Sequence, residues 1–349
     1  MAISNNRMHP LKYLLLVLCF ILVTSLQAAL SLKPSDWFKN NELEELKAFN
    51  AATQAEEGEA VALIEQGKTK LENGSRRSAE RIFKKVTKKY PTTIAAGESL
   101  YLRGKIKMAN AQWIKAFDLL QIIIEEHPEY PKFDQVIAAQ FECATVVMEG
   151  ARSRLFGIIP TFKQETQSIL QFERIVRNAP YGDYAPLALM NIALVAQKLK
   201  QTELSIDALD RLINFYPQST LAPDAYFNLA ETFADLVQSY EHDQGATRKS
   251  ISYYEDFIAL FPQSDNIGIV EARLTEMENS LALSRLHLGD FYYRYRNNNT
   301  AALVFYNEAI TIAPQSDAAA EATLRIARIE EGIRPAKGAR LLRTLLFAN

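Results

Sequence analysis

Apolar residues recur at intervals of three and four through most of the chain, in paired segments that end at a proline. The clearest pair lies between Ala60 and Pro91, where an Asn73-Gly74 turn separates the two segments. Ala79 and Phe83 begin the apolar face of the second segment, the pattern of a helix packed on one side. Pro91 lacks an amide donor and disfavours helix in the residue before it. The pattern therefore predicts a helical hairpin.

The same pattern returns along the chain, with further prolines at the expected hairpin ends. These are Pro128, Pro180, Pro217, Pro262 and Pro314. Gly67 and Ala79 place small residues where the two helices of the first hairpin must touch, as in tetratricopeptide repeats of about 34 residues. The prolines are spaced more widely than that, so some repeats must be longer. The predicted fold is all-α, a tetratricopeptide-like solenoid of about six repeats over residues 60–314 with capping helices over 315–349.

The third repeat departs from this pattern. Its first helix is predicted to run from near Asp134 through Gly150 toward Leu155. An apolar loop with Gly and Pro follows over Phe156–Phe162. Such a loop either folds back against the long helices or binds a partner, since exposed apolar patches tend to mark interaction sites.

The sixth repeat is also long. Ile269–Tyr295 contains no proline and predicts one continuous helix that ends at Asn297–Asn299. This helix is one residue out of frame with Pro314, so a longer loop is expected. Two further helices, Asp317–Glu331 and Pro335–Phe347, are expected to cover the end of the stack.

The first 28 residues have the form of a signal peptide. Arg7 and Lys12 precede the apolar run Tyr13–Leu26, and small residues lie near Ala28. The alternative is an uncleaved anchor over residues 13–32, which also exports the rest of the chain. Lipid attachment at Cys19 is not expected, because the preceding residue is a leucine rather than a small residue. Residues 29–59 are expected to form a linker and an N-terminal helix.

Charge and cysteine content fit an exported helical protein. The chain has 39 Lys and Arg against 41 Asp and Glu, which gives no electrostatic footprint for nucleic acid. Removal of the signal peptide leaves Cys143 as the single cysteine, so no internal disulfide is expected. Cys143 lies on an apolar helical face and is interpreted as a core residue.

The sequence contains no recognisable catalytic or cofactor motif. Its four histidines are scattered, and none lies three or four residues from another His or Cys, as helical metal ligands would. The glycine-rich phosphate loop is missing. We therefore expect neither enzymatic activity nor a bound cofactor.

The repeat pattern resembles that of the BamD family of outer-membrane assembly lipoproteins. The resemblance is best over His127–Pro180, including Leu155-Phe156-Gly157 and Phe172–Arg177, and it is good over Arg273–Pro314. It implies a periplasmic binding scaffold, at or near the outer membrane, whose partners are a membrane-embedded assembly barrel and unfolded barrel precursors. The alternative is a periplasmic scaffold for other envelope or polysaccharide machinery, because tetratricopeptide signatures are shared by many scaffolds.

Two sets of residues are candidates for binding. In the repeat frame, one stripe of the first helices is expected to line a peptide groove. Its members are Lys68, Tyr101, Lys105, Met108, Met190, Gln197, Phe227, Glu231, Asp290 and Tyr293. A basic amphipathic C-terminal end is either a cap with a solvated face or a contact for a membrane surface or an acidic partner. Its members are Arg325, Arg328, Arg334, Lys337, Arg340 and Arg343.

Overall fold

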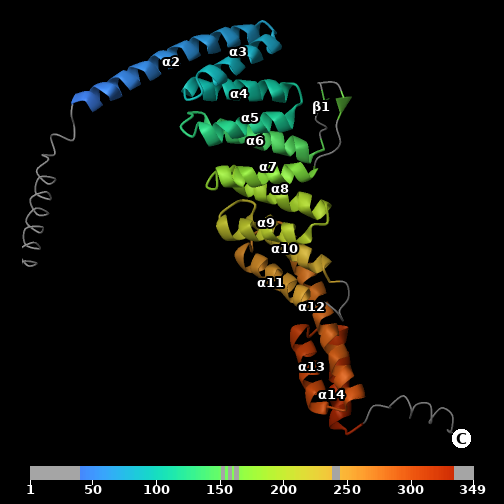
Figure 1. Ribbon diagram of the computed structural model, residues 1–349. Coiled ribbons are helices and arrows are strands. Elements are labelled where there is room, and N and C mark those ends of the chain that lie inside the picture. The colour runs from blue at the N-terminus through green and yellow to red at the C-terminus, as the bar shows by residue number, and fades with distance from the viewer. Residues whose placement is uncertain (1–39, 151–153, 156–158, 161–164, 238–243, 334–349) are drawn as a thin grey trace, which may run out of the picture. The chain divides into compact units, whose positions relative to one another are not determined.

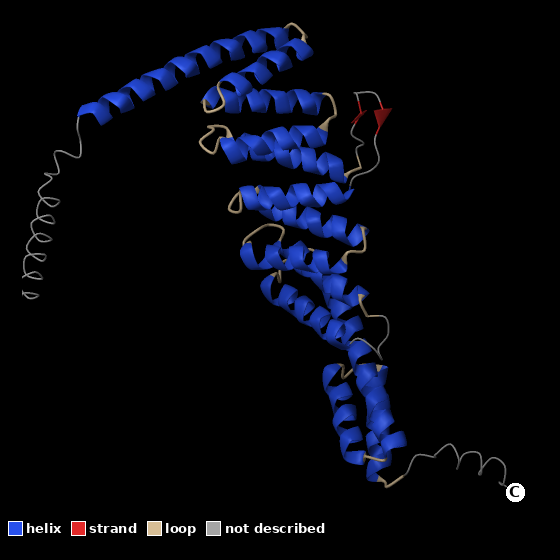
Figure 2. Ribbon diagram, in the orientation of Figure 1, coloured by secondary structure: helices blue, strands red, loops and turns tan. Residues whose placement is uncertain are grey.

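The computed structural model describes residues 40–150, 154–155, 159–160, 165–237 and 244–333, and over them it is almost wholly helical (Figures 1 and 2). The chain falls into two compact units, residues 1–100 and residues 101–349. The predicted signal segment and Cys19 lie outside the described residues.

The first unit contains one long helical hairpin. Helix α2 (Asn40–Glu72) packs against α3 (Arg76–Lys89), and Gly74 turns between them with φ of +75°. A Cβ atom on Gly67 would collide with the ring of Phe83, so the predicted close approach at this glycine is confirmed. The first helix was expected to open the hairpin near residue 60, whereas α2 begins twenty residues earlier and runs through that point without a break. The helix α4 (Ile94–Ala109) crosses from the first unit into the second.

The second unit is a succession of helices, each packed on the next along the chain (Figure 1). They are α5 (Trp113–Glu126), α6 (Phe133–Met148), α7 (Glu165–Asn178), α8 (Tyr184–Lys198), α9 (Thr202–Phe215), α10 (Ala222–Asp235), α11 (Gln244–Leu260), α12 (Ile267–Phe291), α13 (Asn299–Ile312) and α14 (Asp317–Glu330). Paired as α6·α7, α8·α9, α10·α11 and α12·α13, they are the predicted hairpins. The predicted all-α, tetratricopeptide-like repeat fold is therefore confirmed.

Proline sets the end of the second helix in every predicted hairpin. Each of these helices ends two residues before one of the six prolines at the predicted hairpin ends. They are α3, α5, α7, α9, α11 and α13. The residue in between is pushed out of the helical region by the proline ring, and it forms the C-cap. Tyr90, for example, has φ of −130°, and its amide donates back to the Val86 carbonyl.

The third repeat differs from the prediction. Helix α6 ends at Met148 and not near Leu155, because Gly150 takes a φ of +82° that ends the helix. Two short strands follow, β1 (Arg154–Leu155) and β2 (Ile159–Pro160), paired antiparallel. The remainder of the apolar loop, including Phe156 and Phe162, lies outside the described residues, so its role as a plug or a binding loop stays a prediction.

The first helix of the sixth repeat is one residue out of frame with Pro314, and the structure takes up this residue within the helix. The long α12 is confirmed, and it continues into a π-helical turn, η2 (Tyr292–Arg296). Asn297 then takes a left-handed φ of 52°, and the side chain of Asn298 caps α13 by accepting a hydrogen bond from the Ala301 amide at 3.0 Å. The expected longer loop is therefore wrong: a π turn holds one residue more than an α turn, which is enough to restore the frame.

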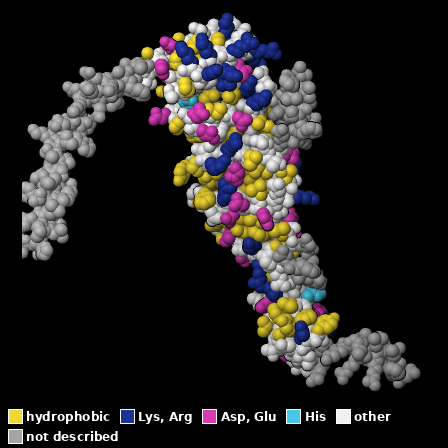
Figure 3. Space-filling view, in the orientation of Figure 1, with side chains coloured by type: hydrophobic (Ala, Val, Ile, Leu, Met, Phe, Trp, Pro, Cys, Tyr) yellow, Lys and Arg dark blue, Asp and Glu magenta, His cyan; other side chains and the backbone are white. Residues whose placement is uncertain are grey.

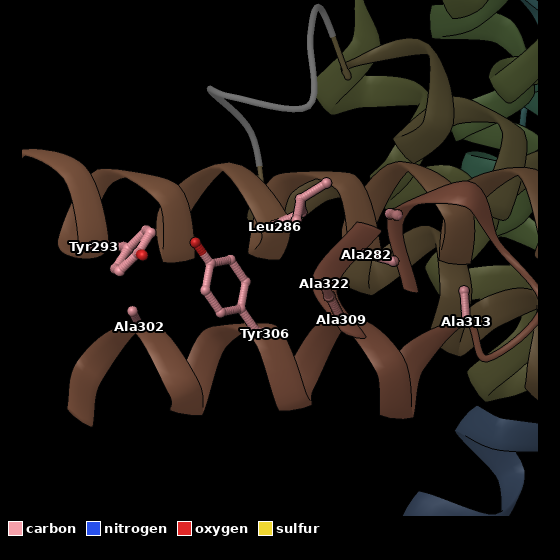
Figure 4. Packing of buried hydrophobic residues seen from close by; sticks show 9 residues of the cluster. Ala282, Leu286, Tyr293, Ala302, Tyr306, Ala309, Ala313 and Ala322 are labelled. Carbon is pink, nitrogen blue, oxygen red and sulfur yellow. The ribbon is translucent and has the colours of Figure 1, made fainter. Parts of the chain in front are cut away.

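The last hairpin shows how the repeat core is built. The ring of Tyr306 points from α13 toward α12 and lies among small residues, with Ala302 and Ala309 on its own helix (Figure 4). A Cβ atom on Gly289 would come within 2.5 Å of that ring. Helix α14 packs on both α12 and α13, with its start capped by Ser316. The second predicted C-terminal helix, over residues 335–347, lies outside the described residues.

Candidate functional site

A cleft of about 620 Å³ opens along the first helices of the fourth and fifth hairpins. It is lined by Gln197, Lys200, Thr202, Phe227, Asn228, Glu231, Thr232, Asp235 and Leu236. These residues come from α8, from the turn and first residue of α9, and from α10 with its C-cap. Three of them, Gln197, Phe227 and Glu231, were predicted as groove residues, and the structure brings those three together.

Amide and hydroxyl groups run along one side of the cleft. The Gln197 amide donates to the Thr232 hydroxyl at 3.0 Å, and that hydroxyl donates to the Asn228 carbonyl at 2.6 Å. The Asn228 side-chain amide donates to the Asp224 carbonyl at 2.8 Å. The groove prediction missed Asn228 and Thr232, although each directly follows a predicted residue and they are four residues apart on one helix face.

Glu231 anchors the next hairpin to this cleft. Its carboxylate accepts hydrogen bonds from the buried hydroxyl of Tyr254 on α11 and pairs with Arg273 of α12 at 3.2 Å. Burial, and then the hydrogen bond to Glu231, raise the pKa of Tyr254 well above its ordinary value. Phe227 packs near the same tyrosine, with ring centroids 6.4 Å apart. One edge of the cleft is thus fixed by an interaction among three helices.

The same arrangement recurs one hairpin further on. Asp290 of α12 accepts a hydrogen bond of 2.7 Å from Tyr306 of α13 and pairs with Arg325 of α14 at 3.1 Å. Arg294 also reaches this carboxylate at 3.2 Å. Asp290 was predicted to line the groove, but its side chain is 19% exposed and is held by these three groups. Its role in this structure is to join helices.

Three predicted groove residues are buried. Met108, Met190 and Tyr293 are 5%, 8% and 4% exposed. Their placement in an open groove is therefore corrected. Met190 lies on α8, which contacts α6 as well as its direct neighbours. Tyr293 lies in the π turn, where the changed helical period turns it into the core around Tyr306, and its hydroxyl donates to the Ile333 carbonyl.

The other predicted groove residues lie in the early repeats. Lys68, in the first unit, is partly buried and pairs with Glu65 at 2.8 Å. Tyr101, in the second unit, is partly exposed, with Tyr130 at 6.3 Å between ring centroids and the Lys132 amine above its ring. Lys105 is exposed. These residues are available for contact, but they do not belong to the cleft on α8 and α10.

The predicted basic C-terminal surface is only partly described. Arg325 is 12% exposed and pairs with Asp290 and Glu321, so it acts within the fold and its assignment to a partner contact is corrected. Arg328 is exposed at the end of α14. Arg334, Lys337, Arg340 and Arg343 lie outside the described residues.

In the described ranges, His, Cys, Asp and Glu side chains form no group of three or more suited to a metal ion. Across the described residues, no helix has both the length and the hydropathy needed to cross a bilayer. Cys143 is fully buried, and burial raises the pKa of its thiol to about 12. This agrees with its interpretation as a core residue, because a thiol so placed is a poor nucleophile.

The stacked hairpins and the polar cleft define a helical-repeat binding scaffold. A family model described as "YfiO: Outer membrane lipoprotein" matches residues 56–210 and 205–331, which is most of the chain. The protein therefore belongs to the YfiO family of outer membrane lipoproteins. This membership confirms the predicted resemblance. The family consists of interaction proteins, so the chain is a scaffold rather than an enzyme.

Curated relatives carry the name "Outer membrane protein assembly factor BamD". The protein of Rickettsia prowazekii (strain Madrid E) is 26% identical over 148 residues, which cover 42% of this chain and 59% of the relative. That of Caulobacter vibrioides is 20% identical over 138 residues, covering 40% and 45%. That of Xylella fastidiosa (strain Temecula1) is 24% identical over 157 residues, covering 42% and 53%. The chain thus spans about half the length of the curated relatives it matches.

Solved structures of helical-repeat proteins also resemble the chain. A tetratricopeptide repeat protein from Parabacteroides merdae is 15% identical, covers 75% of this chain and 96% of its own, and has a TM-score of 0.33. YrrB, described as a TPR protein with an unusual peptide-binding site, is 13% identical, covers 69% of this chain and 97% of its own, and has a TM-score of 0.30. The repeat fold itself is defined by the helix pairing within this chain.

Proposed function

We propose that this protein is an outer-membrane protein assembly factor, a scaffold on the periplasmic face of the outer membrane that holds unfolded barrel precursors. Two observations support this. The chain belongs to a family of outer membrane lipoproteins, and its curated relatives are named as assembly factors. In addition, the signal segment predicted over residues 1–28 would export the chain to the periplasm, where this function takes place.

The observation that carries the proposal is the cleft on α8 and α10. Its side-chain amides, from Gln197 and Asn228, keep bonding capacity beyond the hydrogen bonds described above, so they can exchange hydrogen bonds with a peptide backbone. Phe227 and Leu236 offer apolar surface beside them. Strands of a membrane barrel alternate apolar and polar side chains. An extended segment of such a strand can therefore place apolar side chains on these two residues while its backbone bonds to the amides.

The cleft also carries exposed charged side chains. Lys200 and Asp235 are both exposed in its lining, so it offers one group of each sign to a client. Glu231 is committed to Arg273 and Tyr254 and is not available in the same way. We place the contact with the membrane-embedded assembly barrel at the basic C-terminal end, through Arg328 and the basic residues at 334–343, with Arg325 left out.

Binding of a labelled peptide tests this function. A fluorescent peptide copying one strand of an unfolded outer-membrane barrel is titrated with the full chain and followed by anisotropy. Phe227→Ala is expected to weaken binding about tenfold, as truncating an aromatic anchor commonly does. The double variant Lys200→Ala/Asp235→Ala should weaken it for client segments that carry charge.

The control is Phe215→Ala. Phe215 is 73% exposed and does not line the cleft, so this variant should bind the peptide as the unaltered chain does. Because Phe227 also packs on a core cluster, its variant must first show unchanged helicity. The exposed pair at Lys200 and Asp235 gives a second test that does not touch the core. Equal peptide affinity in all these variants would contradict the proposal.

A further inference from the structure

Helix α3 carries a dense positive charge. Seven of its fourteen residues are Lys or Arg, and Glu80 is its one acidic residue. All seven basic side chains are exposed: Arg76, Arg77, Arg81, Lys84, Lys85, Lys88 and Lys89. In Figure 3, dark-blue side chains gather over this helix.

Five of the basic residues share one face of the helix. Ala79, Phe83 and Val86 are fully buried, and α3 packs with this side on α2. Since each residue advances about 100° around an α-helix, Arg76 and Lys89 fall at the edges of the buried face, and the other five basic positions fall on the opposite side. These five, Arg77, Arg81, Lys84, Lys85 and Lys88, form a stripe about 17 Å long, given the rise of about 1.5 Å per residue. No large apolar side chain of α3 is exposed beside them.

Helix stability explains only part of this arrangement. Lys88 and Lys89 lie in the last turn, where positive charge favours the helix dipole, and Lys89 pairs with Glu59 at 3.2 Å. The remaining basic positions are not explained in this way. Like charges four residues apart, such as Arg81 and Lys85, repel each other. Arg76 and Arg77 lie in the first turn, which contains no acidic residue, and there positive charge opposes the helix dipole. The chain as a whole has a net charge of −2, so the positive charge is local to this helix. A face that costs the helix stability in these ways is best explained by a binding role.

We propose that the basic face of α3 is a docking surface for the anionic phospholipid headgroups of the membrane on which this protein sits. Its charge is complementary to such a surface, and clusters of four to eight Lys and Arg on a helix are typical of it. Membership of an outer membrane lipoprotein family puts a bilayer close to the chain. A docking surface for an acidic protein would be expected to hold large apolar anchor residues among its charges, and α3 exposes no large apolar side chain. This surface is separate from the peptide cleft and does not depend on it.

A fluorophore on α3 and quenchers in the headgroup layer test the contact. Ser78 is exposed on α3 and takes the label as Ser78→Cys, in a full-length chain that also carries Cys19→Ser. Cys143 is buried with its thiol pKa raised to about 12, so it stays unlabelled. The chain is reconstituted into phosphatidylcholine vesicles, with or without about 30 mol% phosphatidylglycerol, a fraction that gives the bilayer a negative surface potential.

We expect quenching only with the anionic vesicles, and we expect high salt to reduce it, since salt screens exposed charges. The α3 variant Arg81→Gln/Lys84→Gln/Lys85→Gln/Lys88→Gln should weaken the contact at least about tenfold, because each charge near such a surface contributes about fivefold. Glutamine keeps a similar helix propensity, so the helix should persist. The matched control removes four exposed charges elsewhere, as Lys115→Gln/Arg177→Gln/Arg248→Gln/Arg296→Gln, and should be quenched like the unaltered chain.

Two results would overturn the proposal. One is quenching that is the same with and without phosphatidylglycerol, or the same in the α3 variant and its control. The other is no quenching by anionic vesicles, together with loss of an acidic protein from envelope pull-downs in the α3 variant alone. That second result would make α3 a protein interface. The N-terminal segment is identical in all these chains, so its own membrane affinity does not affect the comparison.

Discussion

Tyr306 donates a hydrogen bond of 2.7 Å to Asp290, and the same carboxylate pairs with Arg325 of the following helix. Three helices, α12, α13 and α14, therefore meet at one acidic side chain. Glu231, with its partners on α11 and α12, does the same one hairpin earlier. Because the aromatic ring comes from the second helix of a hairpin and the arginine from the helix that follows it, this interaction fixes each hairpin against the next helix of the stack.

Removing one hydroxyl tests the strength of this link. Tyr306→Phe should lower the free energy of unfolding by about 1.5–3 kcal/mol, because a hydrogen bond to a charged group is lost and a partly buried carboxylate loses a donor. Tyr295→Phe is the matched control, since Tyr295 is 78% exposed and should change stability by less than about 0.5 kcal/mol. Chemical denaturation followed by circular dichroism measures both. Equal effects of the two substitutions would show that the hydroxyl does not join the helices.

The two buried tyrosines should make the fold sensitive to alkali. Burial, and then the bonded carboxylate, raise the pKa of Tyr254 and Tyr306 above the ordinary 10.0. Above pH 10 the unfolded chain releases these protons while the folded chain keeps them, so stability is full below pH 10 and falls as the pH rises. The double variant Tyr254→Phe/Tyr306→Phe should lose stability less steeply between about pH 9.5 and 11. A slope unchanged from that of the unaltered chain would contradict the assignment.

Glycine in the first hairpin should resist substitution at one position and tolerate it at another. A Cβ atom at Gly67 would collide with the Phe83 ring, so Gly67→Ala should destabilise by about 1–3 kcal/mol. At Gly58, on the same helix, a Cβ atom would meet nothing within 4 Å, and Gly58→Ala should stabilise by about 0.5–1 kcal/mol through helix propensity. Thermal unfolding distinguishes them. The close packing of this hairpin would be refuted by two shifts of the same sign.

The hairpins could be predicted because their signals are local. A proline ends each second helix two residues before itself, and a small residue marks each close approach, as Gly67 and Gly289 do. The stripe that predicted Gln197, Phe227 and Glu231 also needs only the helical period. The tight end of α6 is set by Gly150 in a left-handed conformation, which the apolar pattern alone does not show.

The remaining site residues depend on contacts distant in sequence. Nothing near Asp290 indicates that Arg325, on a different helix, takes its carboxylate. Met190 is covered by packing between non-neighbouring helices, and Tyr293 is turned inward by a π turn. The basic face of α3 is the opposite case. The basic residues of α3 can be read from the sequence, but the net charge of −2 gives no indication that they cluster on one helix.

Site-specific photo-crosslinking in the full chain tests most directly the claim that the cleft on α8 and α10 receives client peptide. A photoreactive residue replaces Asp235, exposed in the cleft, or Phe215, exposed outside it. Each chain is illuminated with an unfolded outer-membrane barrel protein. The account predicts a crosslink from position 235 that excess strand peptide removes, and a far weaker one from position 215. Equal crosslinking from both positions, or none from position 235 in a chain that melts normally, would contradict it.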